Sequence, residues 1–210
     1  MAEQHWREVE GLVLPQPVAL HPALELVNTY SGWDGTHTSD YLVSYDHLAV
    51  LAGVLDLLPA IDVRRLRRAA RRQPEAATNA LERACTVRAV IRRAVLDPAD
   101  PEATSELTVA TRSAATTVQL LPGTPARWWV PGIAPDDLDR PADAFAWAAA
   151  DLVTRPDVTR VRTCPGRGCG WVFLDTSGRR RWCSMQWCGN RAKVRAHAAR
   201  SRTPRPSGFG

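Results

Sequence analysis

Four cysteines near the C-terminal end of the sequence have the spacing of a metal site. They form two pairs, Cys164-x4-Cys169 and Cys183-x4-Cys188, separated by a connector of thirteen residues. Two close pairs of this kind place four thiolates around one tetrahedral zinc ion. We therefore expect one structural Zn²⁺; two disulfides, a redox switch and an iron–sulfur cluster are the alternatives that the spacing leaves open.

The segment that contains these cysteines is strongly cationic. Residues 160–210 hold 12 arginines or lysines and one acid, Asp175, whereas residues 1–159 hold 15 basic and 21 acidic residues. The overall net charge of +5 therefore hides two parts of opposite sign. A cationic end of this kind favours a polyanionic partner, and double-stranded DNA is the first to consider.

Residues on both sides of the second cysteine pair are the predicted DNA contacts. They are Arg179, Arg180 and Arg181 before the pair, and Asn190, Arg191, Lys193 and Arg195 after it. Arginine and lysine pair with phosphates, arginine also lies bidentate against guanine, and asparagine reads adenine. Two simpler interpretations stay open: the cations only charge the surface, and Asn190 caps the metal turn.

The cysteine segment is expected to fold as a knuckle, a hairpin and a helix, in a treble-clef-like order. The glycine-containing turn over 164–169 is followed by a β-prone run over 171–174, and a helical pattern extends from Ser184 to Ala199. About fifty residues build too small a core to fold without the ion. The residues expected to pack around the metal are Trp171, Phe173, Trp182 and Trp187.

The stretch from Cys164 to Lys193 resembles the CGNR zinc finger of bacterial proteins. The resemblance lies in the cysteine spacing, in the aromatic residues between the pairs and in the tetrapeptide Cys188-Gly189-Asn190-Arg191. In that family the finger follows a domain called ABATE, and Leu24-Glu-Leu-Val-Asn-Thr29 resembles an element near the start of that domain. The resemblance implies a transcription regulator with a DNA-binding finger and a sensing domain.

The fold class that we predict is α+β, with a mostly helical N-terminal domain that carries a small β-hairpin, followed by the small zinc module. Apolar spacing and proline starts predict helices over 41–58, 62–72, 75–96, 101–115 and 141–153, and β-prone runs predict a hairpin over 117–130. The predicted divisions are an exposed extension at 1–19, an ABATE-like domain at 20–158, the finger at 159–200 and a disordered tail at 201–210.

Outside the cysteine segment few residues suggest chemistry. Trp128 and Trp129 fall in a β-prone run whose side chains alternate between faces, so one packs inward and the other is a candidate wall for a small effector. Asn28 is a further candidate ligand contact. The five histidines are scattered, and neither a phosphate-binding loop nor a nucleophile elbow is present, so we do not expect an enzyme.

The leading hypothesis is a DNA-binding transcription regulator in the cytoplasm, at the nucleoid, where thiols stay reduced. The sequence shows no secretory signal and no apolar stretch of the roughly 20 residues that span a membrane. One finger buries too little surface for tight binding alone, so a homodimer or RNA polymerase is an expected partner. The alternatives are RNA binding, with Trp182 and Trp187 stacking on bases, and a zinc-dependent protein-interaction adaptor.

Overall fold

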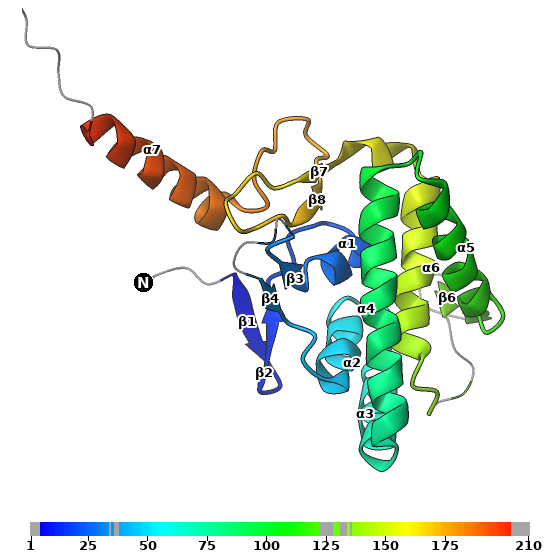
Figure 1. Cartoon of the computed structure of the whole chain (residues 1–210). Coiled ribbons are helices and arrows are strands. Elements are labelled where there is room, and N and C mark those ends of the chain that lie inside the picture. The colour runs from blue at the N-terminus through cyan, green and yellow to red at the C-terminus, as the bar shows by residue number, and fades with distance from the viewer. Residues whose placement is uncertain are drawn as a thin grey trace, which may run out of the picture.

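The computed structural model describes residues 5–33, 35, 38–121, 128–130, 134 and 136–202. A helical body forms its main part (Figure 1). Its helices are α1 (Pro22–Val27), α2 (Tyr45–Val54), α3 (Ala60–Arg72), α4 (Pro74–Leu96), α5 (Pro101–Ala115) and α6 (Arg140–Thr154). The five predicted helices correspond to α2 through α6, and α1 occupies the segment that carries the ABATE-like element.

The helix starts follow local chemistry that is visible in the sequence. Proline occupies the first turn of α1, α4, α5 and α6, where its missing N–H costs no hydrogen bond. Asp100 caps α5 by accepting hydrogen bonds from the backbone N–H groups of Glu102 and Ala103, both at 2.9 Å. The first-turn proline of α4, and the proline and the Asp100 cap of α5, explain why the predicted starts of these two helices agree with the structure.

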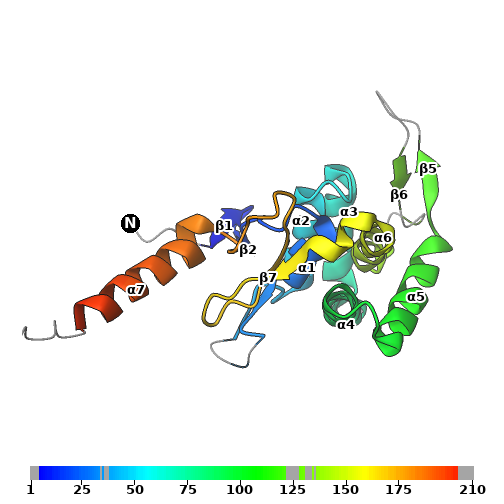
Figure 2. The ribbon, with the colours of Figure 1, turned by 90° about the horizontal axis from the view of Figure 1, so that it is seen from above.

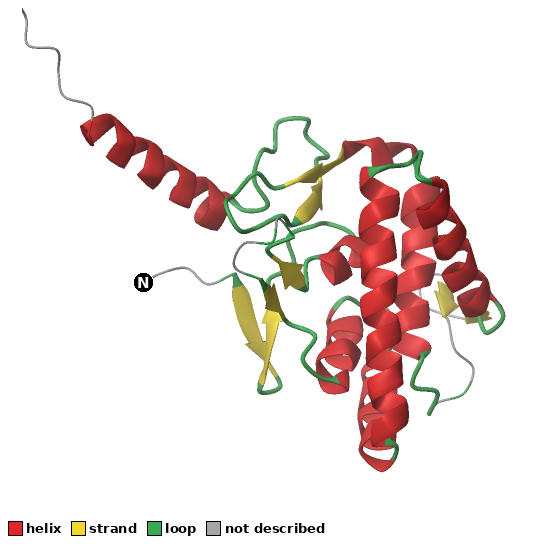
Figure 3. Ribbon diagram, in the orientation of Figure 1, coloured by secondary structure: helices red, strands yellow, loops and turns green. Residues whose placement is uncertain are grey.

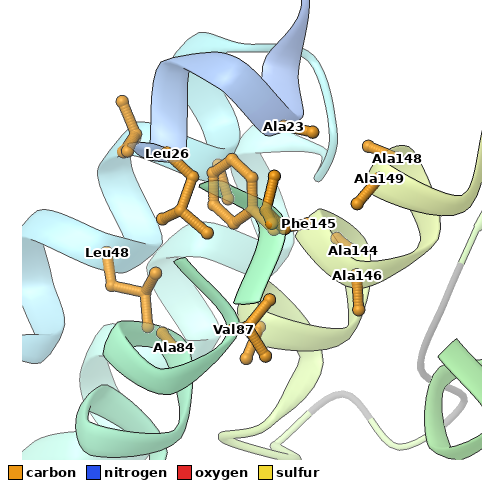
Figure 4. Packing of buried hydrophobic residues seen from close by; sticks show 14 of the residues in the cluster. Ala23, Leu26, Leu48, Ala84, Val87, Ala144, Phe145, Ala146, Ala148 and Ala149 are labelled. Atoms are coloured by element: carbon orange, nitrogen blue, oxygen red, sulfur yellow. The ribbon is translucent and has the colours of Figure 1, made fainter. Parts of the chain in front are cut away.

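The core of the body lies where α6 meets α1, α2 and α4. Phe145 of α6 is fully buried and sits among Leu26, Leu48 and Val87 from these three helices (Figure 4). Alanines on α6, such as Ala148 and its neighbours in Figure 4, have small side chains, so the other helices pack close to its backbone. Burying a side chain as large as phenylalanine stabilises the fold by about 1.5–3 kcal/mol.

Every sheet in the described part of the chain is a two-stranded antiparallel pair (Figure 3). The pairs are β1 (Trp6–Val9) with β2 (Leu12–Pro15), β3 (Tyr30–Ser31) with β4 (Ser39–Asp40), β5 (Gln119–Leu121) with β6 (Trp128–Val130), and β7 (Val161–Thr163) with β8 (Val172–Leu174). The pair β5–β6 confirms the predicted hairpin. Trp128 lies opposite Leu121, and Trp129 lies opposite Leu120. The two tryptophan side chains, on which the predicted aromatic wall depends, lie outside the described part.

The N-terminal residues do not form the exposed extension that we predicted. Residues 6–15 form the hairpin β1–β2, and β2 packs on α2. Leu14 and Ala19 are completely buried in the core, whereas Val13, between Leu12 and Leu14, is 41% exposed. This alternation is that of a strand with one buried face. The prediction was wrong because the run is short and two of the four residues in its first strand, Trp6–Val9, are charged.

Apolar residues of the C-terminal module pack into the core of the helical body. It consists of the short helix η1 (Pro156–Arg160), β7, β8, a π-helical turn η2 (Met185–Gly189) and helix α7 (Asn190–Arg202). Val161, Val172 and Leu174 belong to the same buried cluster as the helices of the body. The boundary predicted between residues 158 and 159 therefore falls inside η1, and apolar packing continues across it. The tail predicted over 201–210 begins too early, because the backbone of residues 201 and 202 belongs to α7. Residues 203–210 of that tail lie outside the described residues.

Candidate metal centre and nucleic-acid interface

The four predicted metal ligands come together at one point. The Sγ atoms of Cys164, Cys169, Cys183 and Cys188 all lie within 4.8 Å of one another, and all four residues are buried. Cys183 Sγ lies 3.6 Å from the Sγ atoms of both Cys169 and Cys188. A tetrahedral zinc ion with Zn–S bonds of about 2.3 Å would hold its sulfurs about 3.8 Å apart. The four thiols therefore form a site for one structural zinc ion.

The same distances argue against the disulfide alternative. All four cysteines are free thiols, and a separation of 3.6 Å greatly exceeds the S–S bond of about 2.05 Å. The first pair is shaped by its backbone: Cys164 N–H donates to the Trp171 carbonyl at 2.7 Å, and Cys169 N–H donates to the Gly166 carbonyl at 2.9 Å. A Cβ atom on Gly166 would lie 2.9 Å from Cys188 Sγ, so only glycine fits there.

Aromatic rings surround the thiols, as expected from the sequence. Trp171, Phe173 and Trp187 are buried in one cluster with the cysteines, and Trp182 is half-buried against it. The ring of His5 joins them, 6.3 Å from Trp171 and 5.6 Å from Trp187 between centroids. Burial lowers the pKa of His5, and the nearby charge of Arg191 lowers it further. Nothing in the sequence marked His5 as part of the metal module.

The structure assigns the predicted ligand contact Asn28 to another role. Its side-chain amide is completely buried and pairs with the backbone of Val172 in β8. Asn28 Nδ2 donates to the Val172 carbonyl at 2.9 Å, and Val172 N–H donates to Asn28 Oδ1 at 2.8 Å. Both ends of the amide are therefore used inside the protein. Asn28 joins α1 to the zinc module, and we remove it from the candidate ligand site.

The buried carboxyl group of Glu25 bonds the segment around Ala19, which lies between α1 and β8. Glu25 is only 4% exposed and accepts a 2.6 Å hydrogen bond from Ala19 N–H. Desolvation raises the pKa of Glu25 to about 7. The carbonyl of Ala19 in turn accepts from Leu174 N–H at 3.0 Å. The segment around Ala19 is thus bonded to α1 on one side and to β8 on the other.

Arg180, a predicted DNA contact, is also engaged within the protein. Its guanidinium donates to the carbonyls of Val18 at 2.5 Å, Trp182 at 3.1 Å and Cys183, and it lies 4.3 Å from the centroid of the Phe173 ring. Burial lowers its pKa, as expected for a cation removed from water. Its neighbours Arg179 and Arg181 are exposed. Only these two of the three arginines present their charge to solvent.

The residues that follow the last cysteine divide in a similar way. Arg191 Nη2 donates to Cys188 Sγ at 3.1 Å, and its Nη1 lies 3.4 Å from His5 Nε2. Asn190 Nδ2 donates to the Gln186 carbonyl at 3.0 Å, which is the capping role left open above. Lys193 and Arg195 are exposed, and the structure gives them no ion pair with any described residue. DNA contact by each of the seven residues stays a prediction.

Two protein-family models match the chain, in the order that the cysteine motif and the α1 segment indicate. Residues 20–156 match ABATE, described as a putative stress-induced transcription regulator, and residues 160–201 match the CGNR zinc finger. The chain belongs to the ABATE family and carries a CGNR zinc finger. No curated protein matches it. The regulator description is that of the family and leaves the roles of individual residues open.

In this ABATE–CGNR protein, α7 extends away from the body. Figures 1 and 2 show it projecting from the zinc module, on the side opposite α5 and α6. Its thirteen residues include no acid. Nearly all of its described side chains are exposed, and its main packing neighbour is η2. Helix α7 is therefore an exposed, positively charged helix whose N-terminal end packs against the metal site.

None of the helices in the described part of this protein combines the length and apolar character of a membrane span.

Proposed function

We propose that this ABATE–CGNR protein is a DNA-binding transcription regulator, that α7 lies against duplex DNA, and that the structural zinc holds α7 in place. The observation that carries the proposal is the projecting helix α7, which has exposed cations and no acid. A helix of thirteen residues is about 20 Å long, and the major groove of B-DNA admits an α-helix. In this account the protein regulates transcription and is not an enzyme.

The cations of α7 are spaced as such a contact requires. Arg195 lies on one flank of the helix, four residues after Arg191, whose guanidinium reaches back to Cys188. Lys193 and Arg200 are seven residues apart and share the opposite flank. A helix in a groove has a phosphate backbone on each side, so cations on both flanks find partners. The strip between the flanks carries alanines, whose small side chains allow close approach to base edges: Ala192, Ala196 and Ala199.

The alternative of base stacking on RNA has less support. Trp187 is 8% exposed and packs against the cysteines, so its ring offers little surface to a base. Trp182 is half-buried, with the guanidinium of Arg181 lying 5.2 Å from its ring centroid. Duplex DNA, which is bound through its phosphates, suits the exposed cations better than a single strand that needs aromatic platforms.

The ABATE domain supplies the second part of the proposal. A single module of this size buries about 600–1,000 Å² on DNA, which is small for a tight complex. We therefore assign to residues 20–158 the sensing of a small effector, or the contact with a second copy or with RNA polymerase that strengthens binding. Sedimentation of the protein with and without duplex DNA distinguishes a dimer from a monomer.

The test is binding of the zinc-loaded full chain to mixed-sequence duplex DNA over a salt series. Replacing Lys193 and Arg195 by alanine should weaken binding at least about tenfold and reduce the salt slope by about two units, since each lost phosphate contact removes roughly 0.9. The matched control replaces Arg64 and Arg68, which are exposed on α3, and removes the same charge.

The proposal for α7 requires that the control pair bind like the parent. Equal losses in both pairs would mean that only overall charge attracts DNA. Unchanged binding in the Lys193 and Arg195 pair would remove α7 from the interface. If single-stranded RNA displaces bound duplex DNA at a lower concentration than unlabelled duplex DNA does, the RNA alternative is favoured.

A further inference from the structure

A groove in the ABATE domain lies far from the metal site. It has a volume of about 530 Å³ and runs between α5, α6 and η1. Figures 1 and 2 show α5 and α6 on the opposite side of the body from α7. The volume is within the range of about 300–1,000 Å³ that small-molecule sites occupy. None of the residues that line it belongs to the proposed DNA interface.

The walls of the groove are aliphatic. Leu107 of α5, Ala150 and Val153 of α6 and Val158 of η1 line it, together with threonine side chains. The described lining contains no aromatic ring and no acid. A flexible hydrocarbon chain fits such walls, because it gains burial along its length and needs no stacking partner. A cationic ligand would find no counter-charge among these residues.

Two polar groups in the groove have no partner within the described protein. The Thr111 hydroxyl is buried and makes no hydrogen bond there. Thr104, Thr108 and Thr154, which also line the groove, each donate to a carbonyl four residues earlier, at 2.8–2.9 Å. Arg112, next to Thr111, is exposed at the groove, and its guanidinium has no ion pair or hydrogen bond with a described residue. A hydroxyl and a guanidinium that are free together suit an anionic oxygen ligand.

We propose that this groove binds a medium-chain aliphatic carboxylate. The hydrocarbon chain lies along Leu107, Ala150 and Val153, and the carboxylate accepts hydrogen bonds from Arg112 and Thr111. The proposal names a ligand class for the sensing role given above to the ABATE domain, and in that sense it rests on the proposed function. Binding itself requires no DNA, so the two can fail separately.

The position of the groove gives the ligand a direct contact with the segment that leads to the finger. Val158 is part of η1, which continues into β7 and then to the first cysteine. The carbonyl of Arg160, at the end of η1, accepts a 3.0 Å hydrogen bond from Asp175 N–H, just beyond β8. A ligand that packs on Val158 therefore touches the only covalent connection between the ABATE domain and the metal site.

Calorimetric titration of the zinc-loaded full chain with decanoate tests the proposal. One molecule of decanoate per chain should bind, and decyltrimethylammonium, with the same chain length and the opposite charge, should bind at least about tenfold more weakly. Arg112→Ala should weaken decanoate about tenfold and remove its advantage over the cation. Arg64→Ala, at an exposed arginine on α3, is the matched control and should leave binding unchanged.

Two further variants test the groove itself. Ala150→Phe fills it and should abolish decanoate binding. Thr111→Val should weaken binding several-fold and, because the hydroxyl has no partner to lose, should leave the melting temperature equal or higher. The proposal is overturned if decanoate does not bind, if decanoate and the cation bind equally, or if Arg112→Ala and Ala150→Phe bind like the parent. None of these outcomes depends on whether α7 binds DNA.

Discussion

The two halves of the CGNR finger relate to the body in opposite ways. The metal-binding half, residues 160–189, is bonded to the ABATE domain through Asn28. It is also bonded to the segment just before that domain, where Arg180 donates to Val18 and Leu174 N–H donates to Ala19. Helix α7 is joined to the metal site near its start, where Arg191 reaches Cys188, and most of its described side chains are exposed. The zinc half is thus part of the protein core, and α7 is presented to solvent. The difference supports the proposal that the metal positions the helix and that the helix contacts DNA.

Removal of the zinc ion should have the largest effect on the stability of the metal-binding half and of the body to which it is bonded. Cys169→Ser removes one of four ligands and should abolish stoichiometric zinc binding. Structural zinc contributes about 10–16 kcal/mol of apparent binding free energy in finger peptides. Because β8 shares the core of the helical body, the loss should also lower the melting temperature of the whole chain. A zinc assay and calorimetric unfolding measure both effects; an unchanged melting temperature would mean that the finger is an independent unit.

Loss of the Asn28 amide should have the next largest effect. Asn28→Ala leaves the N–H and carbonyl of Val172 without partners in a buried site, at a cost of about 4 kcal/mol. Denaturant unfolding measures the change. Asn79→Ala, at an exposed position of α4, is the matched control and should cost less than about 1 kcal/mol. Equal effects at the two positions would contradict the role of Asn28 in joining α1 to the finger.

Glu25, in α1, should make the free energy of unfolding depend on pH. Its pKa is raised from 4.5 to about 7 by burial, so the folded state binds more protons than the unfolded state between these values. The contribution of Glu25 to stability is therefore largest below about pH 4.5 and is lost, by up to about 3 kcal/mol, as pH rises through 7. The difference in unfolding free energy between the parent and Glu25→Gln, followed from pH 5 to 8, should show this fall. A flat difference would mean that Glu25 titrates as in water.

A pair of single substitutions should give the smallest change in stability and the sharpest contrast. Arg180→Ala removes hydrogen bonds to three carbonyls and should cost about 2 kcal/mol. Arg195→Ala, on exposed α7, should change stability by less than about 0.5 kcal/mol. DNA affinity, measured where both variants are folded, should fall for Arg195→Ala. The contrast is lost if the two arginines affect stability alike.

Local features of the sequence were enough to predict much of the fold. The spacing of the cysteines predicted that Cys164 and Cys188 meet, because ligand geometry restricts how far apart paired thiols can lie. Asp100 with Pro101 predicted the start of α5, because a cap and the absent N–H of proline act within one turn. In both cases the residues that interact are close in the sequence or are held by one ion.

Long-range contacts could not be predicted in the same way. The partner of Asn28 lies 144 residues away, and no pattern in either segment marks the pair. Arg179, Arg180 and Arg181 look alike in the sequence, and only the packing of Val18 and Phe173 selects Arg180 for the interior. The groove beside Thr111 depends on how α5 lies against α6, and helical periodicity does not specify that distance.

The central claim is that α7 contacts DNA while the zinc half only positions it. Hydrogen exchange of the zinc-loaded full chain, with and without saturating duplex DNA, tests both halves in one experiment. The exposed turns of α7 should exchange quickly in the free protein and slow down by more than about tenfold on binding, whereas β7 and β8 should be protected equally in both states. Protection that appears over residues 161–183 while α7 stays unchanged would contradict the account.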